Sequence, residues 1–197
     1  LQDSMILRVK NQLKIRTEDV SFVIDELKVM FEKDKRFSQV ADFDKIGIFG
    51  HSFGGCTSIM SAYNDTRIDA VIGLDAYFLP LPKEIIQNNL DRPFVHLGQV
   101  SWGDSDNYEI MRELGKSSNR EFYHFAIEGS KHNDYTDFSQ FTKLTRKFGS
   151  GKISPKSIRY IMNDVMLGFF DYHLKNRSIF DHNQYQKKYE SVKTYVY

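Results

Sequence analysis

The sequence predicts an α/β protein built on a mostly parallel sheet. Apolar runs at 45–50, 70–75 and 94–99 have the composition of short strands covered on both faces. Helical patterns separate at least the first pair and the last pair of predicted strands, and this alternation favours parallel pairing with right-handed crossovers. The first run also continues into a G-x-S-x-G turn, which is typical of a strand that feeds a helix beneath a sheet.

Two further elements complete the predicted sheet region. A fourth strand is expected at 120–129, where the sequence reads REFYHFAIEG. The segment CTSIMSAY after the turn consists of small and apolar residues, so we expect a helix at 53–63 that packs against the sheet. Asn64 and Asp65 should end this helix.

A helix is also predicted at about 17–35, before the first strand. Thr17 is a suitable N-cap, and acidic residues follow it in the first turn, where the helix dipole favours them. Apolar side chains then recur at helical spacing: Val20, Val23, Leu27 and Met30.

The last predicted helix begins at Pro155, with Ser154 as its N-cap. Its apolar residues form a wide stripe that should pack on the sheet: Ile158, Ile161, Val165, Met166, Phe169 and Phe170. The segment 176–197 that follows is polar and rich in tyrosine, and its pattern indicates no role.

The composition fits a globular domain without a nucleic-acid or membrane signature. The 197 residues can bury a full core, 41% of them are hydrophobic, and 27 basic residues balance 26 acidic ones. The basic residues do not gather in a block, which argues against a polyanion as partner. No apolar run approaches the length of a transmembrane helix.

The single cysteine and the first residues indicate how the chain is organised. Cys56 has no partner for an internal disulfide, so we expect it to be a small core residue, and the compartment, cytoplasmic or secreted, stays open. The sequence starts LQDSMILRVK, without an initiator Met or a targeting pattern. We therefore expect a single domain, 1–197, that is part of a longer protein.

Ser52 is the candidate nucleophile. In a turn of this kind the serine sits on a strained backbone between strand and helix, so that its hydroxyl is lifted above the sheet. The neighbouring residues must be small, and Gly50, Gly54 and Gly55 supply this. The competing interpretation is a glycine-rich turn with an incidental serine.

A serine hydroxyl needs a base, and His132 is the best placed of six histidines. It lies in the polar loop EGSKHNDYTDF after the fourth strand, and loops at the carboxyl edge of such sheets collect catalytic groups. The other five are expected to be structural, and the strand geometry should aim the first away from the serine: His51, His96, His124, His173 and His182.

Two positions compete for the carboxylate that orients the base. Asp75 ends the second strand, one crossover from Ser52. Asp104 and Asp106 follow the third strand, but either of them, or Ser105 between them, would also cap the helix around 107–115. The chain order serine, aspartate, histidine holds for each choice.

Two stretches of the chain resemble a known family. GHSFGGCTSIMSAYNDTRIDAVIGLDAYFLPLP and, later, EGSKHNDYTDFSQF are similar to the platelet-activating factor acetylhydrolase family of α/β-hydrolase serine esterases, which has bacterial relatives. The resemblance covers roughly 17–145. It implies the α/β-hydrolase fold, with Ser52 as nucleophile, Asp75 as acid and His132 as base.

The chain departs from the family pattern at several points. Tyr77 stands where the family often has tryptophan, and Asn133 and Asp134 follow the histidine. The region before the turn is also shorter than this fold requires, by about four strands, so the N-terminal strands are expected to be missing. The alternative is a reduced hydrolase with impaired catalysis. The backbone N–H of Phe53 can supply one oxyanion-hole donor, and the second would come from a loop outside this chain.

The expected activity is hydrolysis of a carboxylic ester through an acyl-enzyme, without metal or cofactor. By resemblance, the expected substrate is a short-chain ester or the sn-2 acetyl ester of a phospholipid. Aromatic side chains near the turn and the acid are candidates for an acyl pocket: Phe53, Tyr77, Phe78 and Trp102. An acyltransferase or a thioesterase would use the same residues, and a non-catalytic binding protein on the same scaffold is the alternative of another class.

Overall fold

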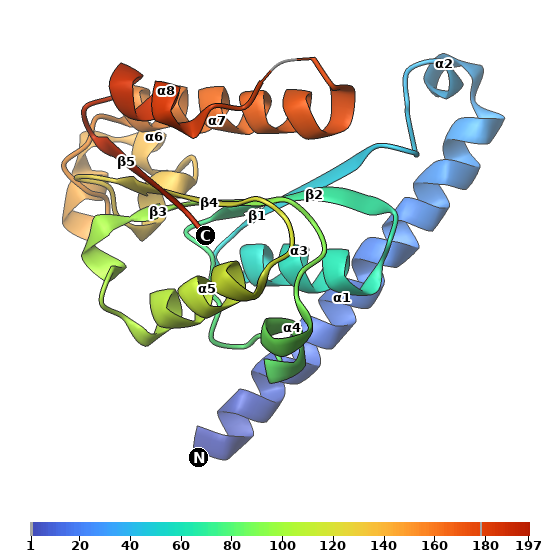
Figure 1. Ribbon diagram of the computed structural model, residues 1–197, viewed down its shortest axis with the longest axis horizontal. Helices are drawn as coiled ribbons and strands as arrows, with labels where there is room; N and C mark the ends of the chain where they lie inside the picture. Colours follow the sequence, from blue (N-terminus) through green and yellow to red (C-terminus); the bar gives the residue numbers. More distant parts are fainter. Residues whose placement is uncertain (1, 178) are drawn as a thin grey trace.

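The computed structural model describes residues 2–177 and 179–197 and contains one five-stranded sheet (Figure 1). The strand order is β1-β2-β3-β4-β5; the first four strands are parallel, and β5 runs antiparallel to β4. The bounds of the strands are Ile46–His51 (β1), Ile68–Leu74 (β2), Phe94–Gln99 (β3), Phe122–Ile127 (β4) and Val192–Val196 (β5).

Helices cover both faces of the sheet (Figure 1). One layer contains α1, α3, α4 and α5, and α7 and α8 lie on the opposite face. The α-helices are Gln2–Lys33 (α1), Lys35–Ser38 (α2), Phe53–Asn64 (α3), Lys83–Asn88 (α4), Asp106–Ser117 (α5), Phe138–Phe141 (α6), Pro155–Lys175 (α7) and His182–Lys188 (α8). The 3₁₀ helices are Val100–Trp102 (η1), His132–Tyr135 (η2) and Lys143–Phe148 (η3).

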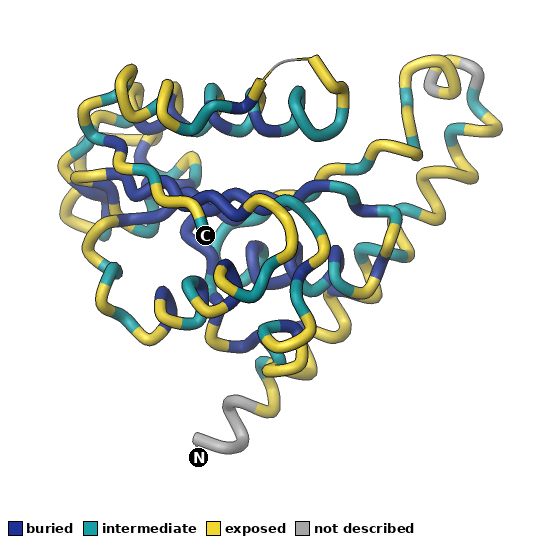
Figure 2. The backbone as a smooth tube through the Cα atoms, viewed as in Figure 1, coloured by how far each residue is buried: buried dark blue, intermediate teal, exposed yellow. Residues whose placement is uncertain are grey.

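The sheet separates two hydrophobic cores, and the buried backbone follows its strands and α3 (Figure 2). The core under α3 and α5 includes Ile59, Val71, Phe94, Met111 and Phe122. The core under α7 includes Ile72, Phe125, Ile161, Val165 and Phe169. Cys56 is fully buried in the first core, and burial raises the pKa of its thiol to about 12, so it is an inert core residue as the sequence predicted.

The predicted strands are confirmed to within two residues at each end. The expectation of burial on both faces holds for β2 and β3, and β4 is buried throughout as well. It does not hold for β1, since Phe49 is 57% exposed. The reason is position, because β1 lies at the edge of the sheet and pairs only with β2 among the described residues.

The predicted N-terminus of the first helix is wrong. The helix α1 starts at Gln2, and Thr17 lies inside it, where its hydroxyl donates to the carbonyl oxygen of Leu13 at 2.8 Å. This bond to the preceding turn lets a threonine sit buried in a helix interior. The side of α1 that packs on the core carries Leu13, Thr17, Val20 and Ile24.

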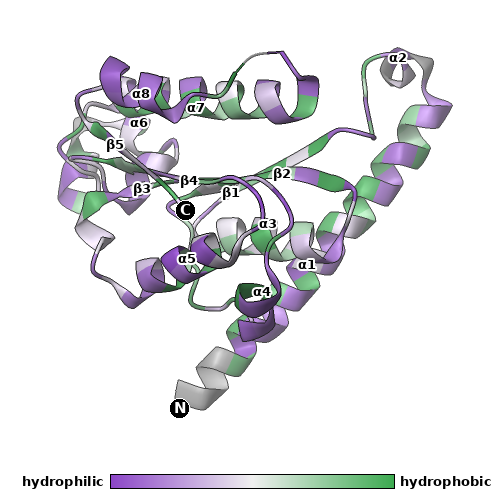
Figure 3. Cartoon of the chain, in the orientation of Figure 1, coloured by the Kyte–Doolittle hydropathy of each residue, from purple (hydrophilic) through white to green (hydrophobic). Residues whose placement is uncertain are grey.

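The predicted stripe of α1 is therefore only partly correct. Val20 packs against the core, but Val23, Leu27 and Met30 are exposed. Figure 3 shows hydrophobic and hydrophilic residues intermixed along the coloured part of α1. Beside β1, the exposed side of α1 borders an apolar groove of about 290 Å³, lined by Val20, Val23, Ile24, Ile46, Ile48 and Ile68. Within the described residues, no helix has the length and apolarity needed to cross a membrane.

The C-terminal helix is confirmed, and the segment after it completes the sheet. The Ser154 hydroxyl accepts a hydrogen bond from the backbone N–H of Ser157 and caps α7, as predicted. The segment 176–197, for which the sequence indicated no role, forms α8 and β5. Val192 and Phe180 of this segment are buried in the core under α7, so the segment belongs to the packed domain.

The register of the sheet aligns the ends of its parallel strands. His51 pairs with Leu74, Leu74 with Leu97, and Gln99 with Ile127. The residues that directly follow β1, β2 and β4 therefore meet at one edge, as expected for an open parallel sheet.

Candidate active site

Ser52 occupies a strained turn between β1 and α3. Its φ of 55° and ψ of −119° lie outside the regions that L-residues ordinarily adopt. Two hydrogen bonds fix this conformation: the Ser52 N–H donates to the Leu74 carbonyl at 3.0 Å, and the Ser52 carbonyl accepts from the N–H of Tyr77 at 2.9 Å. The turn is thus anchored to the end of β2 on both sides of the serine.

Two of the three glycines around Ser52 are required by close backbone approach. A Cβ at Gly50 would lie 2.3 Å from the backbone of Gly54, and one at Gly55 would lie 2.5 Å from the Cβ of Ala76. Both distances are far inside van der Waals contact. A Cβ at Gly54 would meet no described atom within 4 Å, so the sequence-based argument holds for Gly50 and Gly55 but not for Gly54.

Asp75 follows β2, is completely buried and has a φ of 42°. Its carboxylate accepts four hydrogen bonds. Oδ1 accepts from the Tyr108 hydroxyl at 2.8 Å and from the backbone N–H of Gln99 at 3.2 Å. Oδ2 accepts from the side-chain amide of Gln99 and from His132 Nδ1, both at 2.6 Å.

These donors decide the charge of Asp75. Burial alone would raise its pKa, and this is the largest single effect. The hydrogen bonds from His132, Tyr108 and Gln99, together with the neighbouring His96, act in the opposite direction and lower the pKa from its ordinary value. Asp75 is therefore an ionised carboxylate at neutral pH, although it has no contact with solvent.

His132 begins η2, directly after the loop that leaves β4. Because a carboxylate only accepts, Nδ1 of His132 carries the proton of the 2.6 Å bond to Asp75, which leaves Nε2 free to take up a proton. The ring stacks on Trp102 at a centroid distance of 5.2 Å. Among the described residues no hydrogen bond joins the Ser52 hydroxyl to His132, and such bonds are often loose before substrate binds.

His51 was expected to be structural with its side chain directed away from Ser52, and it contacts the His132 loop. Its Nε2–H donates to the backbone carbonyl of His132 at 2.9 Å, and the two rings lie 4.4 Å apart between centroids. Burial, followed by the proximity of His132, lowers the pKa of His51, so the ring is neutral. His51 therefore holds the loop that carries His132, and it does so from the residue next to Ser52.

His96 also contributes to the site, from beneath Asp75. Its Nε2 accepts from the backbone N–H of Ala76 at 3.1 Å, and complete burial lowers its pKa to about 4. The neutral ring thus fixes the backbone that follows the carboxylate. Like His51, it was expected to be structural, and its bond to the residue after Asp75 could not be read from the sequence.

No pattern in the sequence indicates a role at the site for Tyr108 or Gln99. Gln99 is the last residue of β3, and Tyr108 lies on the first turn of α5. A tyrosine in an amphipathic helix ordinarily belongs to the core. Here its ring is buried and its hydroxyl reaches Asp75 across the sheet edge.

The alternative carboxylates are placed elsewhere. Asp106 is the first residue of α5, and Ser105 caps this helix, with its hydroxyl accepting from the N–H of Tyr108. Asp104 is exposed, and no hydrogen bond joins it to His132 among the described residues. The structure therefore brings Asp75, and neither of the other two, into contact with His132.

The aromatic residues expected to line an acyl pocket separate into different environments. Phe78 is fully buried against Phe94 and His96, so it is a core residue. Trp102 stacks on His132. Phe53 lies beside the turn with the Arg16 guanidinium over its ring, at 5.2 Å from the centroid.

The backbone N–H of Phe53 is a free donor beside Ser52. Phe53 is the first residue of α3, where backbone amides have no partner within the helix. In the described part of the chain, this amide donates no hydrogen bond. The positive end of the helix dipole also lies here, so the position favours a developing negative charge.

Comparison with known proteins identifies the family. The model of the family described as platelet-activating factor acetylhydrolase, isoform II, matches residues 5–195. The chain belongs to this family. The match extends well beyond the stretches that carry the sequence resemblance, and it includes the C-terminal segment that forms α8 and β5.

Curated members of the platelet-activating factor acetylhydrolase family are similar over most of this chain. The platelet-activating factor acetylhydrolase of Gallus gallus is 29% identical over 71% of the chain, and that of Canis lupus familiaris is 28% identical over 83%. These matches cover 34% and 35% of the two relatives. The chain thus spans about a third of the length of the curated relatives that it matches.

A solved structure supports the fold. The ferulic acid esterase of Streptomyces cinnamoneus superposes with a TM-score of 0.70 over 87% of this chain and 51% of its own, at 24% sequence identity. At this identity the likeness concerns the fold alone. The architecture, a mostly parallel sheet flanked by helices, is that of an α/β-hydrolase.

The bond between Asp75 and His132 predicts a spectroscopic signature. A short hydrogen bond to a buried carboxylate should move the Nδ1 proton of His132 downfield of ordinary imidazole protons in the ¹H NMR spectrum. We expect this signal in the parent protein and in Asp104→Asn, and its loss in Asp75→Ala. A signal that persists in Asp75→Ala would show that His132 has another partner.

Proposed function

We propose that this chain carries the catalytic residues of a serine ester hydrolase. The observation that carries the proposal is the 2.6 Å hydrogen bond between the buried carboxylate of Asp75 and Nδ1 of His132. The strained turn of Ser52 lies next to this pair. Backbone hydrogen bonds join Ser52 to residues on either side of Asp75, and a hydrogen bond from the adjacent His51 joins the turn to the His132 loop.

In the proposed reaction, Ser52 attacks the carbonyl carbon of an ester while Nε2 of His132 takes the hydroxyl proton. The negative oxygen of the tetrahedral intermediate accepts a hydrogen bond from the N–H of Phe53. When the bond to the alcohol breaks, His132 returns the proton to the leaving oxygen. Water then attacks the acyl carbon while Nε2 of His132 takes its proton. When the bond to Ser52 breaks, His132 returns this proton to the serine oxygen, and the carboxylic acid leaves.

Asp75 has two tasks in this scheme. It keeps the proton of His132 on Nδ1, and it stabilises the imidazolium that forms when Nε2 is protonated. Tyr108 and Gln99 occupy the other lone pairs of the carboxylate, so that it remains charged and correctly oriented while buried. We regard them as positioning residues that act through Asp75.

The proposed substrate is an ester with a short acyl group, such as the sn-2 acetyl ester of a phospholipid. The support is membership of the platelet-activating factor acetylhydrolase family and the names of the curated relatives. An acyltransferase or a thioesterase would use the same residues, because the acceptor is selected by the pocket and not by the triad.

An activity-based probe tests the nucleophile. A fluorophosphonate should label the protein isolated from its natural source, and mass spectrometry should map the adduct to Ser52. Ser52→Ala should abolish labelling, whereas Ser157→Ala, at an exposed serine on α7, should leave it unchanged. No adduct, or an adduct on another residue, would refute the proposed mechanism.

A graded series of substitutions tests the acid and its support. Asp75→Asn should lower kcat by about a thousandfold or more, because the base is left in the wrong tautomer. Tyr108→Phe removes one charge-assisted hydrogen bond from the carboxylate and should lower kcat by about tenfold with little change in KM. Steady-state kinetics with an activated acetyl ester measures both effects.

The matched control in this series is Asp104→Asn, which removes an exposed carboxylate from the loop after β3 and should leave kcat unchanged. If Asp104→Asn reduced turnover more than Asp75→Asn did, the acid would belong after the third strand. If the fall in kcat for Tyr108→Phe matched the fraction of protein that fails to fold, Tyr108 would have a structural role only.

We also propose that a further strand, from outside these residues, pairs with β1 in the active protein. Three observations support this proposal: one edge of β1 has no strand partner in the part of the chain that the structure describes, the ring of Phe49 is exposed, and an apolar groove lies between β1 and α1. Natural proteins avoid long exposed edges because they promote association. The same added part could supply the second oxyanion-hole donor.

Self-association of the isolated chain tests this proposal. The 197 residues alone should associate in sedimentation velocity, and Phe49→Lys, which places a charge on the edge strand, should reduce the association. Tyr160→Lys, at an exposed position on α7, serves as the control and should have no effect. A parent chain that stays monomeric at all concentrations would contradict the proposal.

A further inference from the structure

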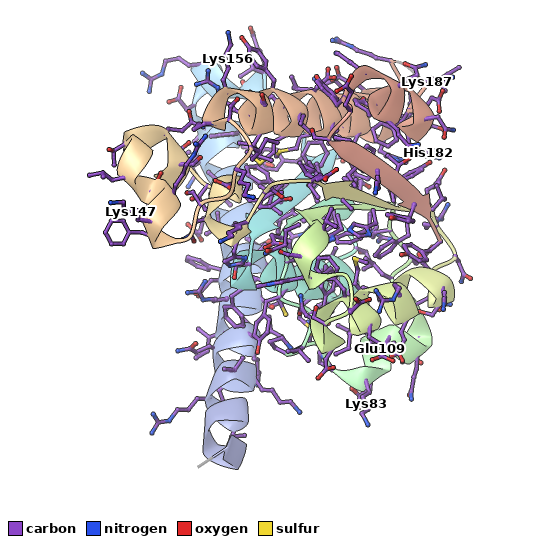
Figure 4. All side chains as sticks on the ribbon, turned by 90° about the vertical axis from the view of Figure 1, so that its left-hand side faces the viewer. Lys83, Glu109, Lys147, Lys156, His182 and Lys187 are labelled. Carbon is purple, nitrogen blue, oxygen red and sulfur yellow. The ribbon has the colours of Figure 1, made fainter. Side chains whose placement is uncertain are left out.

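A second cavity lies behind the catalytic acid. Its volume is about 280 Å³, and its walls come from the loop after β3, from α5, β4 and β5. In Figure 4, α5 is found by its labelled Glu109, and β5 passes above it. The side chains that matter for the argument are Gln99, Tyr108, Arg112, His124, Tyr195 and Tyr197.

His124 is an unsatisfied polar group in the wall of this cavity. It is 5% exposed, and neither ring nitrogen has a hydrogen-bond partner among the described residues, with Nε2 fully buried. Its ring stacks on Tyr195 at 5.5 Å and contacts the edge of Tyr108 at 5.4 Å. Buried polar groups without partners are rare. Nε2 has no accessible surface, so Nδ1 is the ring nitrogen that a molecule in the cavity could reach.

The charges around His124 add a second indication. Burial lowers the pKa of His124 well below its ordinary value, and the nearby His96 and Arg112 add to this effect, so the ring is neutral. Arg112 is half-buried, and its Nη1 donates to the carbonyl of Gly103 at 2.7 Å. No carboxylate pairs with it among the described residues, in contrast to Arg67 and Arg120.

This combination favours one class of ligand. A planar guanidinium with free donors matches a carboxylate, and the rings of Tyr195 and Tyr197 offer an apolar wall. Arg112 is the one cationic side chain that lines the cavity among the described residues, so it favours a monoanion over a dianion. A dianion such as phosphate would carry an uncompensated charge near the exposed carboxylate of Asp104, which also borders the cavity, and near Asp75 behind the wall.

The cavity shares two side chains with the candidate active site. Tyr108 and Gln99 line it, and both donate hydrogen bonds to Asp75, at 2.8 Å and 2.6 Å. Tyr108 is fully buried and Gln99 is 3% exposed, so an occupant would lie beside the residues that hold the carboxylate of Asp75.

We propose that this cavity is a second binding site for a small organic monocarboxylate, with Arg112 as the principal anchor, His124 as a hydrogen-bond partner and the tyrosine rings as the apolar wall. Occupation changes the support of Asp75 through Tyr108 and Gln99, and so changes turnover. The binding site stands on its own geometry; only the effect on turnover rests on the proposed function. Ester hydrolysis itself releases ligands of this class.

Binding is tested with benzoate, acetate and inorganic phosphate as probes of the intact protein. Isothermal titration calorimetry should show binding of benzoate and acetate and weaker binding of phosphate. In ¹³C-edited NMR spectra of the histidine rings, benzoate should shift the signals of His124, while those of His182, on α8, stay in place. Arg112→Gln should weaken benzoate binding by about tenfold or more.

The matched control is Lys116→Gln, which removes an exposed cation one turn further along α5 and should leave the affinity unchanged. A second variant, Ala126→Leu, fills the cavity from β4 without removing a polar group and should abolish benzoate binding. It keeps the test decisive if Arg112→Gln does not fold.

Several results would overturn the proposed site: equal benzoate affinity in the parent and in both cavity variants, phosphate binding as tight as benzoate binding, or shifts confined to His51 and His132 at the candidate active site.

The effect on turnover is measured separately. Benzoate should change kcat in the parent and in Lys116→Gln but not in Ala126→Leu, and an unchanged kcat at saturating benzoate would refute the coupling. If benzoate binds as described but no ester is hydrolysed, the proposed function fails and the site remains.

Discussion

The site depends on keeping one negative charge buried. Asp75 has no contact with solvent, and an unpaired carboxylate in such a place would take up a proton. Four hydrogen bonds prevent this, and they come from three separate parts of the chain: the end of β3, the first turn of α5 and the loop after β4. The sheet register brings these parts together. The packing of the whole carboxyl edge is therefore organised around the charge of a single side chain.

Two of the histidines near this charge bind backbone, and a third, His132, binds the carboxylate itself. His96 and His51 are neutral, and each makes a hydrogen bond with backbone on one side of the Asp75–His132 pair: His96 accepts from the residue after Asp75, and His51 donates to the carbonyl of His132. A neutral ring adds no second charge to the buried carboxylate. In the proposed mechanism, His132 is then the histidine that exchanges a proton with the substrate.

Much of the fold could be predicted because its signals are local. Apolar runs located the strands within two residues, and the serine–proline pair located the start of α7. The start of α1 was wrong, since a threonine can cap a helix or bond back within it, and only the packing of Leu13 and Thr17 decides. At the site, position in the chain suggested Ser52 and His132, but the choice of Asp75 needed the family resemblance. Tyr108, Gln99 and His51 escaped detection because their roles depend on contacts across strands, which no spacing along the chain reveals.

The bond from His51 to the His132 carbonyl has a mechanical consequence. It connects the edge strand to a loop that leaves β4, on the far side of two intervening strands. A displacement of the end of β1 would move Ser52 and, through this bond, the backbone of His132 in the same direction. The bond therefore opposes a change in the spacing of Ser52 and His132, which matters because β1 lies at the edge of the sheet among the described residues.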